Sequence, residues 1–310
     1  GGNAANVSVL ARRIGAEYTG YLGVLADDPP GRHFLAALRE ESVEVSRVRI
    51  GVGKSACNYI VLDDHGDRTF SGNNGKETVQ NLFSLHLTPQ DLAYAAAFDV
   101  IHTSIHSGIS NAVLGGLSRR ADLSMDFSND GFTHTNVAEL APILRFAFFS
   151  AGERSLEEVH TFAKYAADCG IPQVIFTMGT RGACGISQGQ FWQADACVIQ
   201  PVDALGAGDA FIAAFLYTFW ENGGSALLAA EQAAHFAEDD RHRIGGEFQA
   251  AALVKAVRRL DQPHAARLEQ IVVFDPPPCK PLGAGVDKPD VAADPLVPSA
   301  QGCFAVRSRA

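Results

Sequence analysis

FDVIHTS, residues 98–104, opens a region in which short apolar segments alternate with segments of helical periodicity. The segments that follow are SNAVLGGLSRRA (110–121), LSMDFS (123–128), VAELAPILR (137–145), FAFFS (146–150), SLEEVHTFAKYAADCG (155–170) and QVIFTMG (173–179). Such alternation is typical of an α/β fold, in which helices connect the strands of a parallel sheet. Ser155 and Glu158 have the spacing of a capping box, which predicts a helix start at this point.

The ends of the expected strands indicate where a ligand would bind. In open α/β sheets, ligands lie outside the carboxyl ends of the strands. The residues at or just beyond these ends are His102, Thr103, Asn129, Asp130, Ser150, Glu153 and Gly179. We therefore expect the site among them, although His102 and His106 fit equally well as buried core residues.

The composition and net charge of the chain indicate which classes of binding partner to expect. The chain has 310 residues, 47% of them hydrophobic, and a formal net charge of -10. A negative overall field repels phosphate backbones and anionic lipids, so we expect no nucleic-acid and no membrane partner. The six cysteines are scattered without CxxC pairs, which favours a reduced, cytoplasmic location.

A second informative stretch is VDALGAGDAFIAAFLYTFWENGG, residues 202–224. The apolar stripe through Phe211, Phe215 and Phe219 predicts a helix, so the glycines before it form a turn at its N-terminus. Backbone N–H groups and the helix dipole attract an anion there, and a phosphate suits this place. Asp209 could be an ordinary first-turn carboxylate that the helix dipole stabilises. It could also be the base that takes a proton from an attacking hydroxyl.

Two separated motifs resemble the PfkB/ribokinase family of carbohydrate and nucleoside kinases. DALGAGD (203–209) matches one family motif, and GGNAANVSVLARRIGAEYTGYLGVLADDPPG (1–31) matches the other, including its GxxxDDxxG part. The resemblance covers residues 1–246 and implies an ATP-dependent kinase acting on a sugar hydroxyl. It also implies a three-layer α/β/α ribokinase-like fold with a small β-sheet lid at about residues 48–72, where alternating segments flank the turn-like DDHG.

The resemblance assigns roles to individual residues. Asp209 corresponds to the catalytic base, and the anion hole to Gly206, Ala207 and Gly208. The sugar contacts correspond to Gly2, Asn3 and Asn6, and the nucleotide loop to Thr177, Gly179 and Gly182. The alternative is that these residues have a purely structural role, the glycines in turns and an Asn as a helix cap.

The implied cofactors are ATP and Mg²⁺. The family's NxxE motif appears here as SAGE (150–153), with Ser150 in place of the Asn. Glu153 keeps the carboxylate and could hold a magnesium-bound water, although it could equally be an ordinary solvated residue.

The resemblance also implies an organisation of domains. We expect a kinase domain at residues 1–246 that lacks the family's first strand, and a divergent, partly disordered extension at 247–310. PPPCKPLGAGVDKPDVAADPLVPSA (276–300) lacks the periodicity of a core element. Because lids often pair in this family, a homodimer through the lid is expected.

Within the family, several segments are most similar to the branch that phosphorylates the 6-hydroxyl of fructoselysine. These are LDDHGDRTF, FDVIHTSIHSGI, LSMDFSND, FAFFSAGE and GQFWQADACVIQPVDALGAGDAFIAAFL. Other family kinases, acting on fructose, 2-keto-3-deoxygluconate or a nucleoside, remain alternatives, as does a non-catalytic, truncated sugar- or nucleotide-binding fragment. A nicotinamide dehydrogenase is disfavoured because no GxGxxG follows a first strand.

Overall fold

The structure is a computed structural model. It describes residues 2–56, 58–62, 68–73, 77–129, 131–197, 206–240, 270–272 and 302–305.

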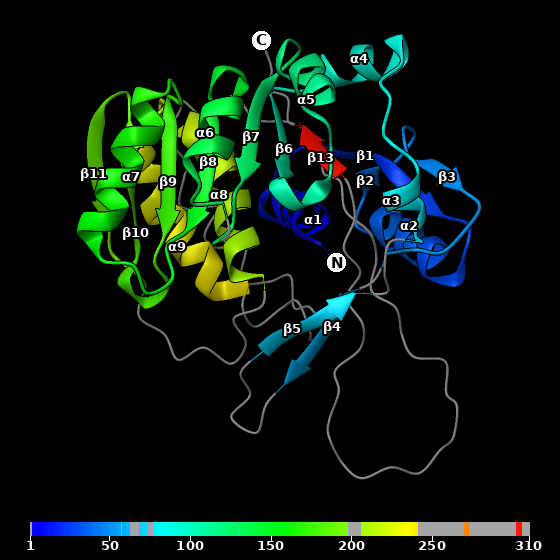
Figure 1. The fold of residues 1–310 in the computed structure, drawn as a ribbon, viewed down its shortest axis with the longest axis horizontal. Helices are drawn as coiled ribbons and strands as arrows, with labels where there is room; N and C mark the ends of the chain where they lie inside the picture. The colour runs from blue at the N-terminus through cyan, green and yellow to red at the C-terminus, as the bar shows by residue number, and fades with distance from the viewer. Residues whose placement is uncertain are drawn as a thin grey trace.

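The described strands form one large sheet and one small one (Figure 1). The large sheet contains β1 (Tyr18–Ala26), β2 (Val43–Glu44), β3 (Arg49–Gly51), β6 (Val100–Ser104), β7 (Asp122–Asp126), β8 (Phe146–Ser150), β9 (Gln173–Thr177), β10 (Ala183–Ser187), β11 (Gln190–Ala194), β12 (Gln270–Val272) and β13 (Gly302–Ala305). Strands β6 to β9 run parallel, whereas β10 and β11 continue the sheet in antiparallel fashion. The parallel α/β sheet expected from the sequence is thereby confirmed.

Helices cover both faces of this sheet. The longer ones are α1 (Asn3–Ile14), α2 (Pro29–Glu40), α5 (Asn111–Ser118), α7 (Leu156–Asp168), α8 (Ala207–Glu221) and α9 (Ala226–Asp240). Shorter segments are α3 (Val79–Leu82), α4 (Pro89–Ala95), α6 (His134–Leu140), η1 (Ile105–Ser107), η2 (Ala141–Ile143) and η3 (Gly179–Arg181). Figure 1 shows α6 and α7 in front of the sheet and α8, α9 and α1 behind it, which is the expected three-layer α/β/α arrangement. The predicted capping box is present, because Ser155 and Glu158 exchange hydrogen bonds at the start of α7.

Aromatic side chains of β8 pack on both faces of the sheet. Phe149 stacks against Phe127 and Phe176 at ring distances of 4.8 Å, whereas Phe146 and Phe148 contact Phe215 of α8. Successive side chains of a strand point to opposite faces, so FAFFS supplies both layers of the core. The sheet and α8 are thereby fixed relative to one another.

A structural reason for the GxxxDDxxG motif lies at the start of α2. The Asp28 carboxylate caps the helix by accepting from the Gly31 amide at 2.9 Å, and it also binds the Ser55 amide and hydroxyl at 2.8 and 2.7 Å. A Cβ on Gly31 would lie 2.0 Å from the carbonyl oxygen of Ala26, so glycine is required there. Asp28 therefore ties α2 to the segment that leads into the lid.

The small sheet pairs β4 (Asn58–Leu62) with β5 (Arg68–Asn73) in antiparallel fashion and lies apart from the large sheet in Figure 1. It corresponds to the expected lid. The turn DDHG lies outside the described residues. Residues 49–51, within the expected lid range, instead pair with β1 in the large sheet, so the separate sheet begins later in the chain.

Two short strands belong to the range expected as an extension. Strand β12 pairs with β1 and β6, and β13 pairs antiparallel with β1 through residues 20–23 and with β6 at Thr103. The boundary at residue 246 stays a prediction. Among the described parts of the chain, no helix has both the length and the apolar character that crossing a membrane would require.

Candidate active site

The GAGD turn forms the N-terminus of α8. Gly206 has a φ of 81°, which favours glycine, and the first bond inside the helix runs from the Ala210 amide to the Gly206 carbonyl at 2.8 Å. The amides of residues 207–209 precede that bond, and such first-turn amides have no partner within a helix. A Cβ built on Gly208 would meet no atom within 4 Å. The turn can therefore present its amides and the positive end of the helix dipole to an anion.

Asp209 is the third residue of α8, and two asparagines of α1 hold its carboxylate. Asn3 donates through Nδ2 to Oδ1 at 2.8 Å, and Asn6 donates through Nδ2 to Oδ2 at 2.7 Å. Residues three apart share one face of a helix, which is why both asparagines reach the same carboxylate. The predicted sugar contacts Asn3 and Asn6 thus lie beside the predicted base.

The environment of Asp209 raises its pKa to about 7. Burial is the largest cause, since it disfavours the charged form. The nearby Asp126 carboxylate acts in the same direction, whereas the hydrogen bonds from Asn6 and Asn3 lower the pKa. A carboxylate that titrates near neutral pH is suited to accepting a proton from a hydroxyl.

Asp126 is a site residue that the sequence analysis missed. It ends β7, and its Oδ2 accepts from the same Asn3 Nδ2 at 2.8 Å, while its Oδ1 accepts from the Ser128 amide at 2.7 Å. Burial raises the pKa of Asp126, against the hydrogen bonds from Ser128 and the charge of His106, which lower it. The available signal was a lone carboxylate between the apolar Met125 and Phe127.

The other residues expected at the ends of β6 and β7 lie in different surroundings. Asn129 is exposed, and Asp130 lies outside the described residues. His102 and Thr103 of β6 are both fully buried, and His102 contacts Asn3 and Ser124. Burial lowers the pKa of His102 to about 3, so its ring is neutral at physiological pH.

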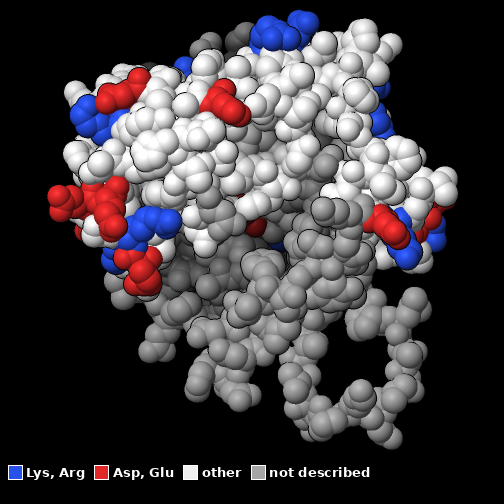
Figure 2. All heavy atoms as spheres, viewed as in Figure 1, with Lys and Arg blue, Asp and Glu red and all other residues white. Residues whose placement is uncertain are grey.

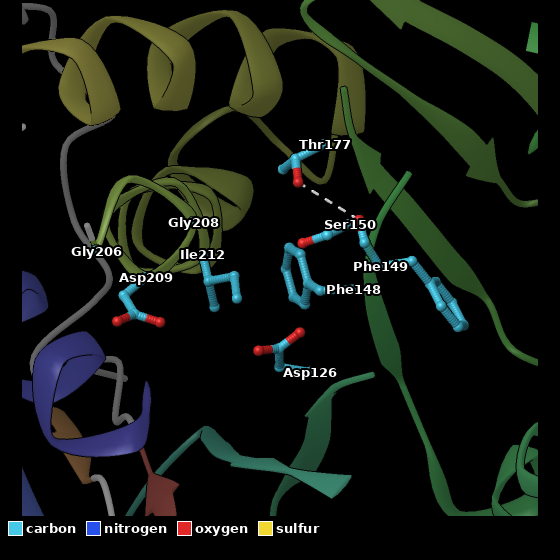
Figure 3. A pocket seen from close by; sticks show the side chains of 9 residues that line it. All are labelled: Asp126, Phe148, Phe149, Ser150, Thr177, Gly206, Gly208, Asp209 and Ile212. Atoms are coloured by element: carbon cyan, nitrogen blue, oxygen red, sulfur yellow. Dashed lines mark hydrogen bonds between the residues drawn. The ribbon is translucent and has the colours of Figure 1, made fainter. Parts of the chain in front are cut away.

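A cavity of about 150 Å³ brings the main elements together. Its lining consists of Asp126, Phe148, Phe149, Ser150, Thr177, Gly206, Gly208, Asp209 and Ile212. Figure 3 shows the carboxylates of Asp126 and Asp209 on the same side of this space, near Ile212 and Phe148. The cavity joins the carboxyl ends of β7, β8 and β9 to the start of α8, as expected for an α/β sheet.

The predicted nucleotide loop is only partly in this cavity. Thr177 lines it, whereas Gly179 and Gly182 belong to the turn after β9. The Gly182 amide binds the Gly179 carbonyl at 3.0 Å, and a Cβ on Gly182 would lie 2.1 Å from the Ala194 carbonyl oxygen. Packing therefore accounts for Gly182, and its nucleotide role stays a prediction.

Gly2 and Glu153 are not among the residues that line the cavity. Gly2 caps α1, and its carbonyl accepts from the Asn6 amide at 3.0 Å, while Glu153 is exposed beyond β8. Among the described residues, no group of three His, Cys, Asp or Glu side chains could hold a metal ion. Magnesium is often held by one or two carboxylates with phosphates and waters, and a metal role for Glu153 stays a prediction.

Charged side chains of both signs lie around the edge of the face in Figure 2. Uncharged residues cover most of the described surface between them, with a few charged atoms visible nearer the centre. The described atoms of this face therefore form no continuous basic strip of the kind that follows a phosphate backbone.

The family model of pfkB carbohydrate kinases matches residues 1–238. Fructosamine kinase FrlD of Bacillus subtilis (strain 168) is 33% identical over 219 residues, which are 71% of this chain and 76% of the relative. Fructoselysine 6-kinase of Escherichia coli (strain K12) is 31% identical over 216 residues, 70% of this chain and 80% of the relative. A fructokinase of Klebsiella pneumoniae is 29% identical over 254 residues, 74% of this chain and 80% of the relative.

Solved structures share the fold. A ribokinase of Arabidopsis thaliana complexed with ribose and ATP has a TM-score of 0.70 at 18% identity, covering 83% of this chain and 87% of its own. A fructokinase of Vibrio cholerae O395, bound to fructose, ADP and calcium, has a TM-score of 0.64 at 23% identity, covering 82% and 90%. With its three-layer ribokinase-like fold and its sequence relatives, this chain belongs to the pfkB family of carbohydrate kinases and is a sugar kinase.

Proposed function

We propose that this sugar kinase transfers the γ-phosphoryl group of ATP, with Mg²⁺, to the 6-hydroxyl of fructoselysine. The observation that carries the proposal is the placement of Asp209. Its carboxylate lies in the cavity wall, held by Asn3 and Asn6, within the first turn of the helix whose amides can bind a phosphate.

The chemistry follows from this arrangement. Asp209 accepts the proton of the sugar hydroxyl as the hydroxyl oxygen attacks the γ-phosphorus of ATP. The bond between the γ-phosphorus and the leaving ADP oxygen breaks. The amides of residues 207–209 stabilise the charge on the transferred group. Mg²⁺ bound with the ATP phosphates would supply further charge neutralisation, with Glu153 as its predicted protein ligand. Phosphoryl transfer depends mostly on such positioning and charge stabilisation.

The choice of sugar rests on two supports. The first is sequence similarity to kinases named for fructosamine and fructoselysine, at 33% and 31% identity. The second is the charge of the cavity, since the described residues that line it include Asp126 and Asp209 but neither Lys nor Arg. The acidic groups of this lining favour a substrate carrying an ammonium group over an anionic sugar.

A substrate panel tests this proposal. The purified protein is assayed for ADP release with fructoselysine, fructose, ribose, 2-keto-3-deoxygluconate and adenosine, with MgATP and with excess EDTA. We expect the highest kcat/KM for fructoselysine and loss of turnover with EDTA. A higher kcat/KM for fructose would identify a fructokinase, the second candidate, which similarity to the Klebsiella pneumoniae enzyme supports. Transfer to none of these acceptors would contradict the proposal.

We also propose that two copies pair through the lid region. Large apolar side chains are exposed where β3 leads toward the lid and beside α3: Ile50, Val52, Leu82 and Phe83, with Val52 90% exposed. An exposed apolar group of this kind is typical of a protein interface. Light scattering should give the mass of a dimer, and Val52→Asp should give a monomer. A wild-type monomer at micromolar concentration would contradict this assembly.

A further inference from the structure

A chain of hydrogen bonds leads from the interior of the sheet to Asp209. Ser124 Oγ lies 2.8 Å from His102 Nδ1, and His102 Nε2 lies 3.1 Å from Asn3 Oδ1. Asn3 Nδ2 then lies 2.8 Å from both Asp126 Oδ2 and Asp209 Oδ1. One amide therefore connects a buried histidine to two carboxylates.

The partners of Asn3 decide how its amide is oriented. A carboxylate accepts hydrogen bonds, so the group facing Asp126 and Asp209 must be the NH₂ end of the amide. The oxygen end consequently faces His102. Because an amide oxygen can only accept, Nε2 of His102 must carry the proton and Nδ1 must accept from the Ser124 hydroxyl.

The position of His102 fixes this tautomer. His102 on β6 and Ser124 on β7 are direct register partners in neighbouring parallel strands. The ring is fully buried and meets the Phe148 ring edge to face at 6.2 Å. His102 is not among the cavity lining residues, so it acts on the site through Asn3.

We propose that His102 is a positioning residue for phosphoryl transfer: its Nε2–H holds the Asn3 amide in the one orientation that donates to both Asp126 and Asp209. The inference rests on the proposed role of Asp209 as the base. Without this N–H, the oxygen end of the Asn3 amide loses its partner, and the amide is held less firmly against the two carboxylates. A weaker hydrogen bond from Asn3 disfavours the ionised form of Asp209 and so raises its pKa.

The groups that set this titration can be named among the described residues. Asp126 of β7 faces Asp209 across the Asn3 amide, and His102 of β6 acts through the same amide. His106 of η1 influences Asp126. Of these groups, His102 is the one that contacts the oxygen end of the Asn3 amide, whereas the two carboxylates contact its NH₂ end.

The test compares His102→Gln with His102→Asn. The longer Gln can place an N–H near the position of Nε2, whereas the shorter Asn can reach only the Ser124 side. We expect His102→Asn to lower kcat by about 10- to 100-fold, the scale of an approximately 1 Å misplacement, and to shift the acidic limb of the kcat/KM profile to higher pH. We expect His102→Gln to restore most of the rate and the wild-type limb. Equal limbs in the wild-type and Asn proteins would overturn the proposal.

Two further measurements keep the outcome decisive. If the variants do not fold, as judged by thermal unfolding, the nitrogen chemical shifts of the wild-type His102 ring show which ring nitrogen carries the proton. A neutral ring protonated at Nε2 from pH 5 to 9 is expected, and one protonated at Nδ1 would overturn the inference. Asp209→Asn separates the two proposals. If this variant keeps its turnover, Asp209 is not the base. If it is inactive while the His102 variants keep the wild-type acidic limb, only the positioning role of His102 is refuted.

Discussion

At the residue scale, opposing effects act on the Asp209 carboxylate. Burial and the Asp126 carboxylate raise its pKa, while the amides of Asn6 and Asn3 lower it, and the balance lies at about 7. Full desolvation alone would leave the carboxyl protonated and unable to act as a base. The two asparagines therefore keep a buried carboxylate usable at neutral pH.

Asp209→Asn should reduce kcat by about 100- to 10,000-fold, the usual contribution of a general base. Asn has nearly the same size and can stay at the helix start, so ATP affinity should be retained. Turnover by ADP release and ATP affinity by calorimetry are measured on the same preparation. Near-normal turnover would reduce Asp209 to a favourable charge at the N-terminus of the helix.

The pH dependence follows from the same balance. The base must be ionised, so kcat/KM should rise with pH through about 7, the pKa to which Asp209 is raised. Asn6→Ala removes the hydrogen bond at 2.7 Å that lowers this pKa, so the rise should move to higher pH. The measurement is a kcat/KM profile from pH 5 to 9 for both proteins. An unchanged or lower midpoint in the variant would be inconsistent with this account of the site.

At the element scale, the N-terminus of α8 combines a helix start with an open space. Gly208 lies in the first turn and lines the cavity, without the positive φ that Gly206 adopts. A Cβ there would meet no atom of a described residue outside its own helix turn within 4 Å. Its glycine is thus not required by packing, and the space in front of it is the place proposed for a phosphate.

Gly208→Ala should therefore weaken ATP binding and turnover by about tenfold or more while leaving Tm unchanged or higher. Alanine favours a helix over glycine by about 0.5–1 kcal/mol, so the fold does not lose stability. Gly115→Ala in α5 is the matched control, because a Cβ there meets only the end of the Arg119 side chain at 3.8 Å. It should leave activity intact. Full activity in Gly208→Ala would argue against an anion site at this turn.

The elements also show which parts of the molecule local sequence can predict. Periodicity predicted β6 to β9, and the spacing of Ser155 and Glu158 predicted the start of α7. The role of Asp126 could not be predicted this way, because its partner Asn3 lies 123 residues away. The segment RIG (49–51) has the same alternation as the lid, and periodicity does not say which sheet a strand joins.

At the scale of the whole molecule, the sheet joins segments from both ends of the chain. Strand β1 lies beside β12 and β13, and both of these strands also pair with β6. The site elements α1 and β6 flank this part of the sheet. Stability of the sheet at β1 and β6 is therefore linked to the placement of α1, whose Asn3 and Asn6 donate hydrogen bonds to Asp209.

Deleting residues 302–310 tests that link. The deletion removes β13, which pairs with β1 at four positions, so main-chain groups of β1 and β6 lose partners. Each lost hydrogen bond costs about 1 kcal/mol of stability. Each kcal/mol lowers Tm by about 2–4 °C in a domain of this size, so Tm should fall by about 5 °C or more. Deletion of residues 306–310 keeps β13 and serves as the control, with Tm unchanged. The low periodicity of the C-terminal range predicts the opposite, that even the longer deletion is neutral. An unchanged Tm after the longer deletion would show that β13 contributes nothing to the sheet and would favour an extension outside the kinase domain.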